Sequence, residues 1–254
     1  MTAPVRVSER DLRTLLGIVV GDHGDLPEAG LPDSLLSDLM TVVRGDLVTF
    51  SGLDSARQTH WFGQDVPARD ISGGVQGFWG HYWDCPFVSY PDRTGDLCSV
   101  TKISDFYSAR QWHSAAIYSD YYRAHEFEHQ LELRLPIPPG PDAGPGRTIR
   151  LAFFRGRGRD FSERDRALLT LLRPHLHQAY LGAERRRRPA PQLTPRQWQL
   201  LRLVAAGHTN AQIARQLGVS EGTVRIHLQN IYARLHVPSR TAAVTRAFAD
   251  LATM

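Results

Sequence analysis

The sequence predicts two domains: an α+β domain in which helices flank an antiparallel sheet, and a smaller all-α, tetrahelical domain. Three observations lead to this prediction. The length of 254 residues suits one domain of about 180 residues and one of about 60. The predicted strands all fall in the first part, and charge is divided unevenly between the two parts. We place the first domain at 1–183, a basic, proline-containing linker at 184–192 and the second domain at 193–254.

Composition excludes several classes of protein. Hydrophobic residues make up 42% of the chain and aromatic residues 9%, which is too much for a disordered chain. No apolar stretch approaches the roughly 20 residues needed to cross a bilayer, and the N-terminus lacks the apolar core of a signal peptide. We therefore expect a cytoplasmic protein that makes no contact with membranes. Its two cysteines, Cys85 and Cys98, are expected to be free thiols.

Helical spacing marks both ends of the first domain. Ser8 is a typical N-cap residue, and a second helix is expected after Pro32. A last helix is expected from Ser162, whose hydroxyl can form a capping box with Asp165. The apolar stripes of these helices are Leu12, Leu15, Leu16 and Val19; Leu35, Leu39 and Val43; and Leu168, Leu171, Leu172 and Leu176.

Strands are expected between these helices. Segments 45–51 and 58–62 are typical of a hairpin, 98–103 of a further strand and 106–122 of helical structure. Two long strands are expected at 125–137 and 148–155, joined by the loop PPGPDAGPG, whose composition is that of a turn.

Residues 125–129 read HEFEH, which matches the H-E-x-x-H pattern of zinc proteases. The surrounding residues alternate strictly between apolar and polar side chains, which predicts a strand instead of a helix. On a strand, His125 and His129 would lie about 13 Å apart, too far to share one zinc ion. A metalloprotease is therefore rejected, no metal or cofactor is expected, and the two histidines are placed at the mouth of a half-buried sheet face.

The segment 193–235 has the pattern of three short amphipathic helices joined by tight turns. Each begins at a residue whose side chain can accept hydrogen bonds from the first backbone N–H groups, and the first two end at glycine. The caps are Thr194, Thr209 or Asn210, and Ser220, and the terminating glycines are Gly207 and Gly218. A fourth helix is expected at 240–251.

The third of these helices has two faces of different composition. One stripe consists of Val224, Leu228, Ile231 and Leu235 and must pack against the other helices, and the opposite face carries Gly222, Arg225, Ile226, Gln229 and Ala233. Arg225 can form a bidentate contact with guanine, Gln229 can do so with adenine, and Ile226 can touch a thymine methyl group. The outer face therefore suits the edges of DNA bases, and a helical bundle without a DNA role is the alternative.

Residues 193–248 resemble the LuxR-type helix-turn-helix domain of bacterial transcription regulators. The family's pattern of LT-x-R, A-x-G, N-x-x-IA-x-x-L, S-x-x-TV-x-x-H and KL-x-V-x-x-R-x-x-A is met by Leu193, Thr194, Arg196, Ala205, Gly207, Asn210, Ile213, Ala214, Leu217, Ser220, Thr223, Val224, His227, Leu235, Val237, Arg240 and Ala243. The departures are Gln197, Gln199 and Gln212 in place of Glu, and Arg234 in place of Lys. Loss of three acidic groups beside a polyanion should strengthen the sequence-independent part of DNA binding.

This resemblance implies a double-stranded promoter or operator as partner, a homodimer associated with the nucleoid, and contact with RNA polymerase. It implies DNA contacts after the helix caps. The candidate DNA-binding residues are Thr209, Asn210, Thr223, Arg225, Ile226, His227, Gln229, Asn230, Arg234 and Arg240.

Charge supports a separate module for an acidic partner. The chain carries 30 basic and 26 acidic residues, a net charge of +4. From residue 184 onward there are eleven Arg against three acidic residues, a net of +8, so the first 183 residues carry −4.

One segment of the first domain resembles the GAF-type sensory domains of actinobacterial LuxR-type regulators. The sequence DFSERDRALLTLLRPHL at 160–176 follows a strand that ends in Arg155. The resemblance implies a GAF-like domain that binds a small-molecule effector or serves dimerisation. Candidate pocket residues, which could equally be core residues, are Trp79, Trp83, Trp112, Tyr118, His125, Phe127 and His129.

Two other regulator classes have the same order of domains. A phosphorylated receiver would use Asp11, Asp54 and Lys102, but Asp11 lies inside a helical pattern instead of at a strand end. An acyl-homoserine-lactone receptor fits in length and domain order, but the Asp-Pro pair of its pocket is missing. We therefore expect a sequence-specific DNA-binding regulator without catalytic activity, controlled by its GAF-like N-terminal domain.

Overall fold

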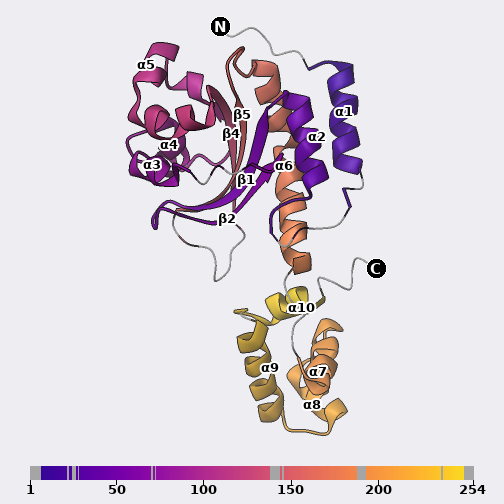
Figure 1. Cartoon of the computed structure of the whole chain (residues 1–254). Helices are drawn as coiled ribbons and strands as arrows, with labels where there is room; N and C mark the ends of the chain where they lie inside the picture. Colours follow the sequence, from indigo (N-terminus) through magenta and orange to yellow (C-terminus); the bar gives the residue numbers. More distant parts are fainter. Residues whose placement is uncertain are drawn as a thin grey trace. The chain divides into compact units, whose positions relative to one another are not determined.

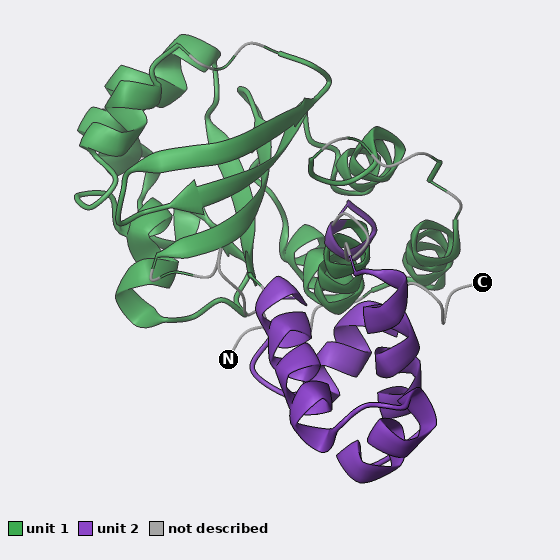
Figure 2. Cartoon of the chain, turned by 90° about the horizontal axis from the view of Figure 1, so that it is seen from below, with its two compact units in different colours: residues 1–183 green, residues 184–254 purple. Residues whose placement is uncertain are grey.

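The computed structural model describes residues 7–21, 23–24, 27, 29–69, 71, 73–137, 144, 146–187, 193–235 and 237–248. The chain divides into two compact units, Met1–Ala183 and Glu184–Met254, coloured green and purple in Figure 2. The first unit is built around a sheet and the second consists of helices (Figure 1).

The first unit has a five-stranded sheet in the order β2-β1-β5-β4-β3, and every pair of neighbouring strands is antiparallel. The strands are β1 (Leu47–Asp54), β2 (Thr59–Val66), β3 (Thr101–Lys102), β4 (His129–Pro136) and β5 (Arg147–Arg155). The predicted α+β class with an antiparallel sheet is therefore confirmed.

Helices cover both faces of this sheet (Figure 1). One face is covered by α1 (Glu9–Val20), α2 (Asp33–Val43) and α6 (Glu163–Arg187), which bury a mainly aliphatic core against the strands. The other is covered by α3 (Val75–Gly80), α4 (Pro86–Thr94), α5 (Ala109–Ser114) and the π-helical turn η2 (Tyr118–Tyr122), over a core rich in aromatic residues. Two 3-10 turns, η1 (Ile103–Asp105) and η3 (Arg123–His125), complete the unit.

The predicted helix starts are confirmed at atomic detail. Ser8 and Asp11 form a reciprocal capping box, and the Ser162 hydroxyl likewise accepts from the Asp165 N–H at 3.2 Å. The guanidinium group of Arg164 pairs with the Asp11 carboxylate, which fastens α1 to α6. That pairing, with the backbone N–H of Ser8, holds the pKa of Asp11 well below its usual range.

The predicted apolar stripes are only partly buried. In α1, Leu15 is buried as predicted, together with Ile18, but Leu12, Leu16 and Val19 are exposed. In α6, Leu171 is also exposed, whereas the rest of its stripe and all of the α2 stripe lie in the core. Helical spacing identified these helices correctly, but it assigned too wide a face to the core.

The strand predicted at 125–137 begins only at His129, because the chain turns immediately before it. The turn η3 ends at Glu126, whose backbone is left-handed with a φ of 61°. Phe127 nevertheless enters the aromatic core from this turn, so the alternating pattern continues beyond the strand itself. Most of the loop predicted between the two long strands lies outside the described residues.

The strand predicted at 98–103 is reduced to the two residues of β3. The Asp96 carboxylate accepts hydrogen bonds from the N–H groups of Cys98 and Ser99, at 2.7 and 3.0 Å, and holds this stretch in a turn. Within the segment predicted as helical, α5 and η2 form with a break between them. The helices α3 and α4 were not predicted, although Trp79 and Tyr82 stand at helical spacing.

The polar side of β4 is the largest departure from prediction. Alternation places Gln130, Glu132 and Arg134 on a solvated face, yet none of the three is more than 1% exposed. Arg134 Nε donates to Glu132 Oε1 at 2.7 Å, and Gln130 Nε2 donates to Glu132 Oε2 at 2.6 Å. The remaining Arg134 nitrogens donate to Thr148 Oγ1 and to the carbonyl oxygen of Val88 in α4. The helices that cover the aromatic core therefore bury this hydrogen-bonded network, in which the charges of Arg134 and Glu132 are paired.

The second unit consists of α7 (Pro195–Ala205), α8 (Asn210–Leu217), α9 (Glu221–Leu235) and α10 (Arg240–Phe248). Capping boxes at Thr194 and Thr209 start the first two, and Gly207 and Gly218 follow them with φ values of 84° and 66°. These caps and terminating glycines are as predicted. In the segment predicted as a linker, α6 continues to Arg187, and residues 188–192 lie outside the described part of the chain.

Both cysteines are free thiols, as predicted, with Cys85 buried and Cys98 exposed. Burial raises the pKa of the Cys85 thiol, so Cys98 is the more reactive of the two. In the part of the chain that the structure describes, no helix combines the length and apolar character needed to cross a membrane.

Replacing Glu132 with Gln is expected to lower the free energy of unfolding by about 3–5 kcal/mol, because the buried Arg134 loses the one carboxylate with which it pairs among the described residues. The double variant Glu132→Met with Arg134→Met should be less destabilised than the single variant Glu132→Met, since it leaves no unpaired charge. Urea unfolding of these variants and of the single variant Arg134→Met measures this coupling. Purely additive effects would show that the two side chains do not stabilise the fold as a pair.

Candidate nucleic-acid interface and ligand cavity

The two faces of α9 are separated in the structure as the sequence predicts. Val224, Leu228, Ile231 and Leu235 are buried in the core of the second unit. On the opposite face Gly222, Arg225, Ile226, Gln229 and Ala233 are all exposed. Ile226 is 59% exposed, an unfavourable position for a large apolar side chain unless a partner covers it. The outer face therefore has the character of a contact surface.

A tight turn fixes the start of α9 against α8. Gly218 takes the left-handed conformation, and the N–H of Val219 donates to the carbonyl oxygen of Ala214 at 3.0 Å. Ser220 then caps α9, because its hydroxyl accepts from the N–H of Thr223 at 3.1 Å. The short connection leaves α9 no freedom to rotate its outer face away from solvent.

Some of the predicted DNA-contact residues also have partners inside the unit. Arg240 Nη1 donates to Asn210 Oδ1 at 3.1 Å, and its Nη2 donates to the carbonyl oxygen of His208. Arg234 Nη1 donates to Gln197 Oε1 at 3.2 Å. These bonds tie α10 to the start of α8, and α9 to α7. Of the other candidates, Thr209, Arg225, Ile226, Gln229 and Asn230 are exposed, and Thr223 and His227 are half-buried.

Two glutamines that replace the glutamates usual in the resembled family keep a structural role. Gln197 Oε1 accepts from the N–H of Thr194 at 2.9 Å, and Gln212 Oε1 accepts from the N–H of Thr209 at 2.7 Å. Both bonds complete capping boxes, which need only an acceptor at this position. The substitutions therefore preserve the helix caps while removing negative charge from this unit.

Three features of α9 define a helix-turn-helix domain. One stripe of α9 is buried against two other helices, its opposite face exposes Arg and Gln one turn apart, and a tight turn precedes it. Residues 191–247 match the GerE family, described as bacterial regulatory proteins, luxR family. The C-terminal domain of this chain therefore belongs to the luxR family.

Remote similarities to solved structures extend over more of the chain. The crystal structure of Escherichia coli SdiA is 19% identical, covering 94% of this chain and 96% of that chain with a TM-score of 0.42. SdiA in complex with octanoyl-rac-glycerol is 17% identical, covering 96% and 97% with a TM-score of 0.46. The VqsR LBD domain from Pseudomonas aeruginosa is 18% identical, covering 68% of this chain and 96% of that chain with a TM-score of 0.43.

The first unit contains a cavity of about 850 Å³ between the aromatic-layer face of the sheet and α3, called here the α3 cavity. The strands contribute mainly polar side chains to it, and α3 and η2 contribute aromatic and aliphatic ones. Its lining residues are Thr49, Ser51, Arg57, Gln58, Thr59, His60, Gly63, Asp65, Arg69, Ile71, Val75, Gln76, Trp79, Gly80, Tyr121 and Arg150.

The predicted pocket residues are distributed over three cavities. Trp79 lines the α3 cavity; Trp112, Tyr118 and His129 line one of about 720 Å³; and Tyr118, His125 and Phe127 line one of about 410 Å³. Trp83 lines none of these three and is 42% exposed. Sequence reasoning did not identify Ser51, Asp65 or Arg150, because polar residues within strands look like a solvated face until α3 is placed over them.

Burial alters the acid–base properties of the α3 cavity. Desolvation, together with the nearby cations Arg150 and Arg134, lowers the pKa of His60 to about 3. Desolvation also raises the pKa of Asp65, even though the Thr49 hydroxyl donates to its carboxylate at 2.7 Å. The wall therefore holds a neutral imidazole beside a buried guanidinium group.

The histidines of the HEFEH segment have separate partners. His125 Nε2 lies 2.5 Å from the carbonyl oxygen of Gly73, whereas His129 Nδ1 lies 3.5 Å from Asp160 Oδ1. Among the described residues, no cluster of three or more His, Cys, Asp or Glu could hold a metal ion. The prediction of one strand through both histidines is wrong. The two imidazole rings contact different residues.

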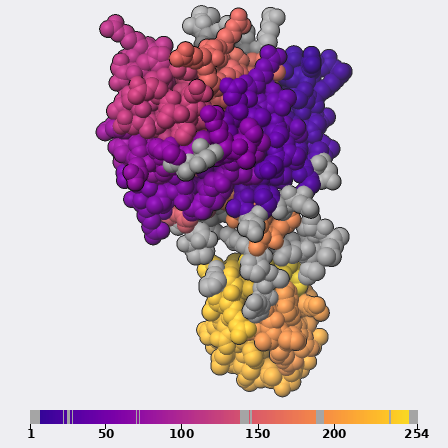
Figure 3. All heavy atoms as spheres, in the orientation of Figure 1, coloured from indigo at the N-terminus to yellow at the C-terminus, as the bar shows by residue number. Residues whose placement is uncertain are grey.

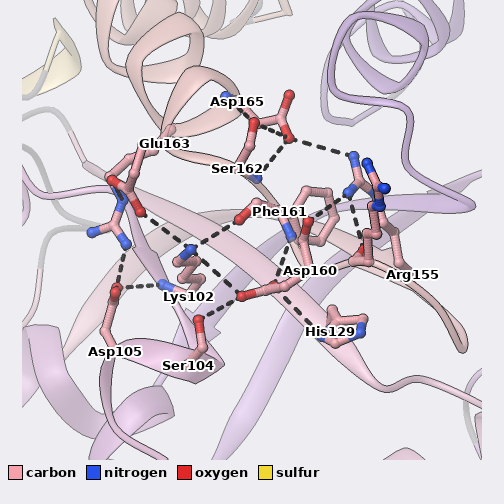
Figure 4. Close-up of polar contacts among 12 residues, drawn as sticks. Lys102, Ser104, Asp105, His129, Arg155, Asp160, Phe161, Ser162, Glu163 and Asp165 are labelled. Carbon is pink, nitrogen blue, oxygen red and sulfur yellow. Dashed lines mark hydrogen bonds and ion pairs between the residues drawn. The ribbon is translucent and has the colours of Figure 1, made fainter. Parts of the chain in front are cut away.

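A polar cluster fastens β3 to the start of α6 (Figure 4). Lys102, the single lysine of the chain, donates from Nζ to the carbonyl oxygen of Phe161 at 2.9 Å and lies 3.2 Å from Glu163 Oε1. Asp11 pairs with Arg164 on α6, and Asp54 lies 3.8 Å from Arg147 at the start of β5. The three residues that a receiver would need together thus have different partners, and the antiparallel sheet is also unlike a receiver's.

His60 is expected to stay neutral down to about pH 4, because its pKa in the folded protein is about 3. The unfolded chain binds a proton there near pH 6.5, so this histidine should destabilise the fold progressively as the pH falls from 6.5 towards 3. NMR titration of the ring and urea unfolding across this range measure both effects. His60→Gln should flatten the pH dependence, and a ring that titrates near 6.5 would contradict the prediction.

Proposed function

We propose that this protein is a sequence-specific DNA-binding transcription regulator that reads the major groove with α9. The observation that carries the proposal is the exposed Arg225, Ile226 and Gln229 on the outer face of α9 within a luxR-family domain. Guanidinium and amide groups one helical turn apart match the donor and acceptor pattern of guanine and adenine edges. A catalytic activity is no part of this proposal.

The charge of the second unit supports DNA binding. Eleven Arg against three acidic residues from position 184 onward provide contacts to phosphate groups that do not depend on sequence. Phosphate contacts release counterions, so affinity should fall steeply with salt. We therefore propose that Arg225 and Gln229 provide specificity, while the other exposed arginines provide general affinity.

We propose that the regulator acts as a homodimer, because one reading helix covers only a few base pairs. In α10, Ala243 and Ala247 are 0% and 3% exposed within the core of their own unit, so they are not free for a symmetry mate. α1 lies at the outer surface of the first unit (Figure 3), and its Leu12, Leu16, Val19 and Val20 are 41–74% exposed. That apolar surface supports self-association. We also propose that the regulator contacts RNA polymerase.

We further propose that the first unit is a GAF-like sensory domain that binds a small-molecule effector in the α3 cavity. A concave site of this size, with an apolar wall and a few convergent polar groups, is typical of ligand pockets. An acyl-homoserine-lactone receptor is the alternative with the same cavity. Arg150 in the wall argues against it, because such a lactone carries no charge.

Arg225→Ala and Gln229→Ala should each reduce discrimination between specific and random DNA by about 1–3 kcal/mol. Binding sites are first located by genome-wide footprinting of the full chain, where two half-sites related by two-fold symmetry would support the homodimer. Fluorescence anisotropy then measures affinity for specific and random duplexes. Arg202→Ala, which changes an exposed arginine of α7, is the matched control and should leave the ratio unchanged. An unaltered ratio for both α9 variants would refute the proposed reading face.

Gly63→Leu should empty the α3 cavity of any effector. Gly63 lines the cavity, and a Cβ atom built there meets no neighbouring atom within 4 Å, so a larger side chain would extend into the open space. Native mass spectrometry of protein purified from its own host should show a bound mass that is absent from this variant. Gly17→Leu, where a Cβ also meets open space but outside the cavity, is the control. Wild-type protein without any bound mass would indicate a role in dimerisation or protein contacts instead.

A further inference from the structure

We propose that the effector carries an oxyanion, a carboxylate or a phosphate, that binds Arg150 and Ser51 on the strand wall of the α3 cavity. This inference rests on the proposed sensory function and adds the charge and anchoring point of the ligand. It starts from two buried polar groups whose hydrogen-bonding capacity the protein itself does not use.

Arg150 is a buried cation with incomplete partners. It is 2% exposed, and no described residue accepts a hydrogen bond from its Nε or its Nη1. Its guanidinium group lies over the ring of Phe78, with Cζ 5.2 Å from the centroid, and shares a side-chain hydrogen bond with Tyr121. The ion pairs found among the described residues involve other arginines. A buried guanidinium in this condition is costly unless an anion joins it.

The strand register places a second cation beside Arg150. Arg150 of β5 stands directly opposite Arg134 of β4, on the same face of the sheet. Glu132 pairs with Arg134 at 2.7 Å, whereas Asp65, which lines the same cavity, makes only a longer-range Coulombic interaction with Arg150. Like charges on opposite positions of neighbouring strands repel each other. An anion at Arg150 would complete the charge balance that Glu132 provides for Arg134.

Ser51 supplies a hydroxyl donor next to this cation. It pairs across the strands with Arg150 on β5 and with Gly63 on β2. Its side chain is buried, and Oγ has no hydrogen-bond partner among the described residues. Ser51, Gly63 and Arg150 all line the α3 cavity, and the missing side chain of Gly63 leaves open space beside the two donors. A hydroxyl and a guanidinium N–H at neighbouring positions can both donate to one oxyanion.

The charge of the whole lining favours the same ligand. Among the described residues that line the cavity, Arg57, Arg69 and Arg150 stand against one carboxylate, that of Asp65. Burial raises the pKa of Asp65, which weakens its opposition to an incoming anion. His60 remains neutral in the folded protein at physiological pH. The cavity is therefore cationic before any ligand enters.

The opposite wall defines the rest of the molecule. Trp79, Val75 and Ile71 face the polar strands across the cavity, and its volume of about 850 Å³ is that of a drug-sized ligand site. The best match is an amphipathic acid whose head group lies at Arg150 and whose apolar body lies against α3. A neutral amide or lactone would leave the Arg150 nitrogens unsatisfied.

Four octyl compounds with different head groups test the proposal: octanoate, octyl phosphate, octanamide and octanol. Isothermal titration calorimetry on the full-length protein at pH 7 is expected to show at least one of the two oxyanions binding about tenfold or more tightly than both neutral compounds. The order of octanoate and octyl phosphate distinguishes a carboxylate effector from a phosphate effector.

Arg150→Met should remove this preference by weakening oxyanion binding about tenfold or more, while octanol binding is retained. The same variant should raise the melting temperature of the ligand-free protein, because it removes an incompletely paired buried cation. Arg147→Met, on the same strand but outside the cavity, is the matched control and should change neither affinity. If Arg150→Met does not fold, Ser51→Ala provides the test through a smaller loss of oxyanion affinity.

Equal binding of octanol and the oxyanions, or full oxyanion affinity in a folded Arg150→Met or Ser51→Ala variant, would overturn the inference. Absence of binding by all four compounds would overturn it as well. DNA binding by the same preparation is measured in parallel, so that loss of the ligand inference is distinguished from failure of the proposed regulatory function.

Discussion

The need to compensate charge inside the first unit shapes its architecture. Both faces of the sheet are covered, so the polar side of β4 and β5 is removed from water together with its two arginines. Arg134 is compensated by Glu132, and its hydrogen bond to the Val88 carbonyl ties α4 to the sheet. Among the described residues, no carboxylate forms an equivalent ion pair with Arg150, which lines the α3 cavity. The helices that cover this face therefore bury a hydrogen-bonded network around Arg134 on β4 and an incompletely paired cation, Arg150, on β5. In this way a stable core and the proposed ligand site can share one face of the sheet.

In the C-terminal unit, one face of α9 stays exposed. Its core takes the stripe of α9, while caps and the Arg240 contact with Asn210 hold the helix ends. Glutamine at positions 197 and 212 completes two capping boxes without adding negative charge. The caps are therefore completed in a way that leaves the net positive charge of this unit unchanged. Among the described residues of this unit, Ile226 is the large apolar residue that is exposed.

Predictions from the sequence succeeded where a local interaction decides the structure. The starts of α1, α6, α7 and α8, and the glycines after α7 and α8, follow from hydrogen bonds and backbone conformations within a few residues. They failed where neighbours distant in sequence decide. The alternation through HEFEH predicted one strand, but Glu126 turns the chain while Phe127 still reaches the core. Ser51 and Arg150 could not be assigned to a site, since only strand pairing brings them side by side.

By itself, the sequence determined the position and the two faces of α9, the uneven division of charge between the two parts of the chain, and the α+β class of the first part. These properties reside in helical periodicity, caps and counts of charged residues, none of which requires knowledge of long-range contacts. Only the tertiary structure decided that the polar side of β4 and β5 is buried, that the predicted pocket aromatics line separate cavities, and that Arg150 stands beside Ser51. The physical reason is that burial depends on which layer covers a strand, and an alternating pattern is the same whether water or a helix lies on its polar side.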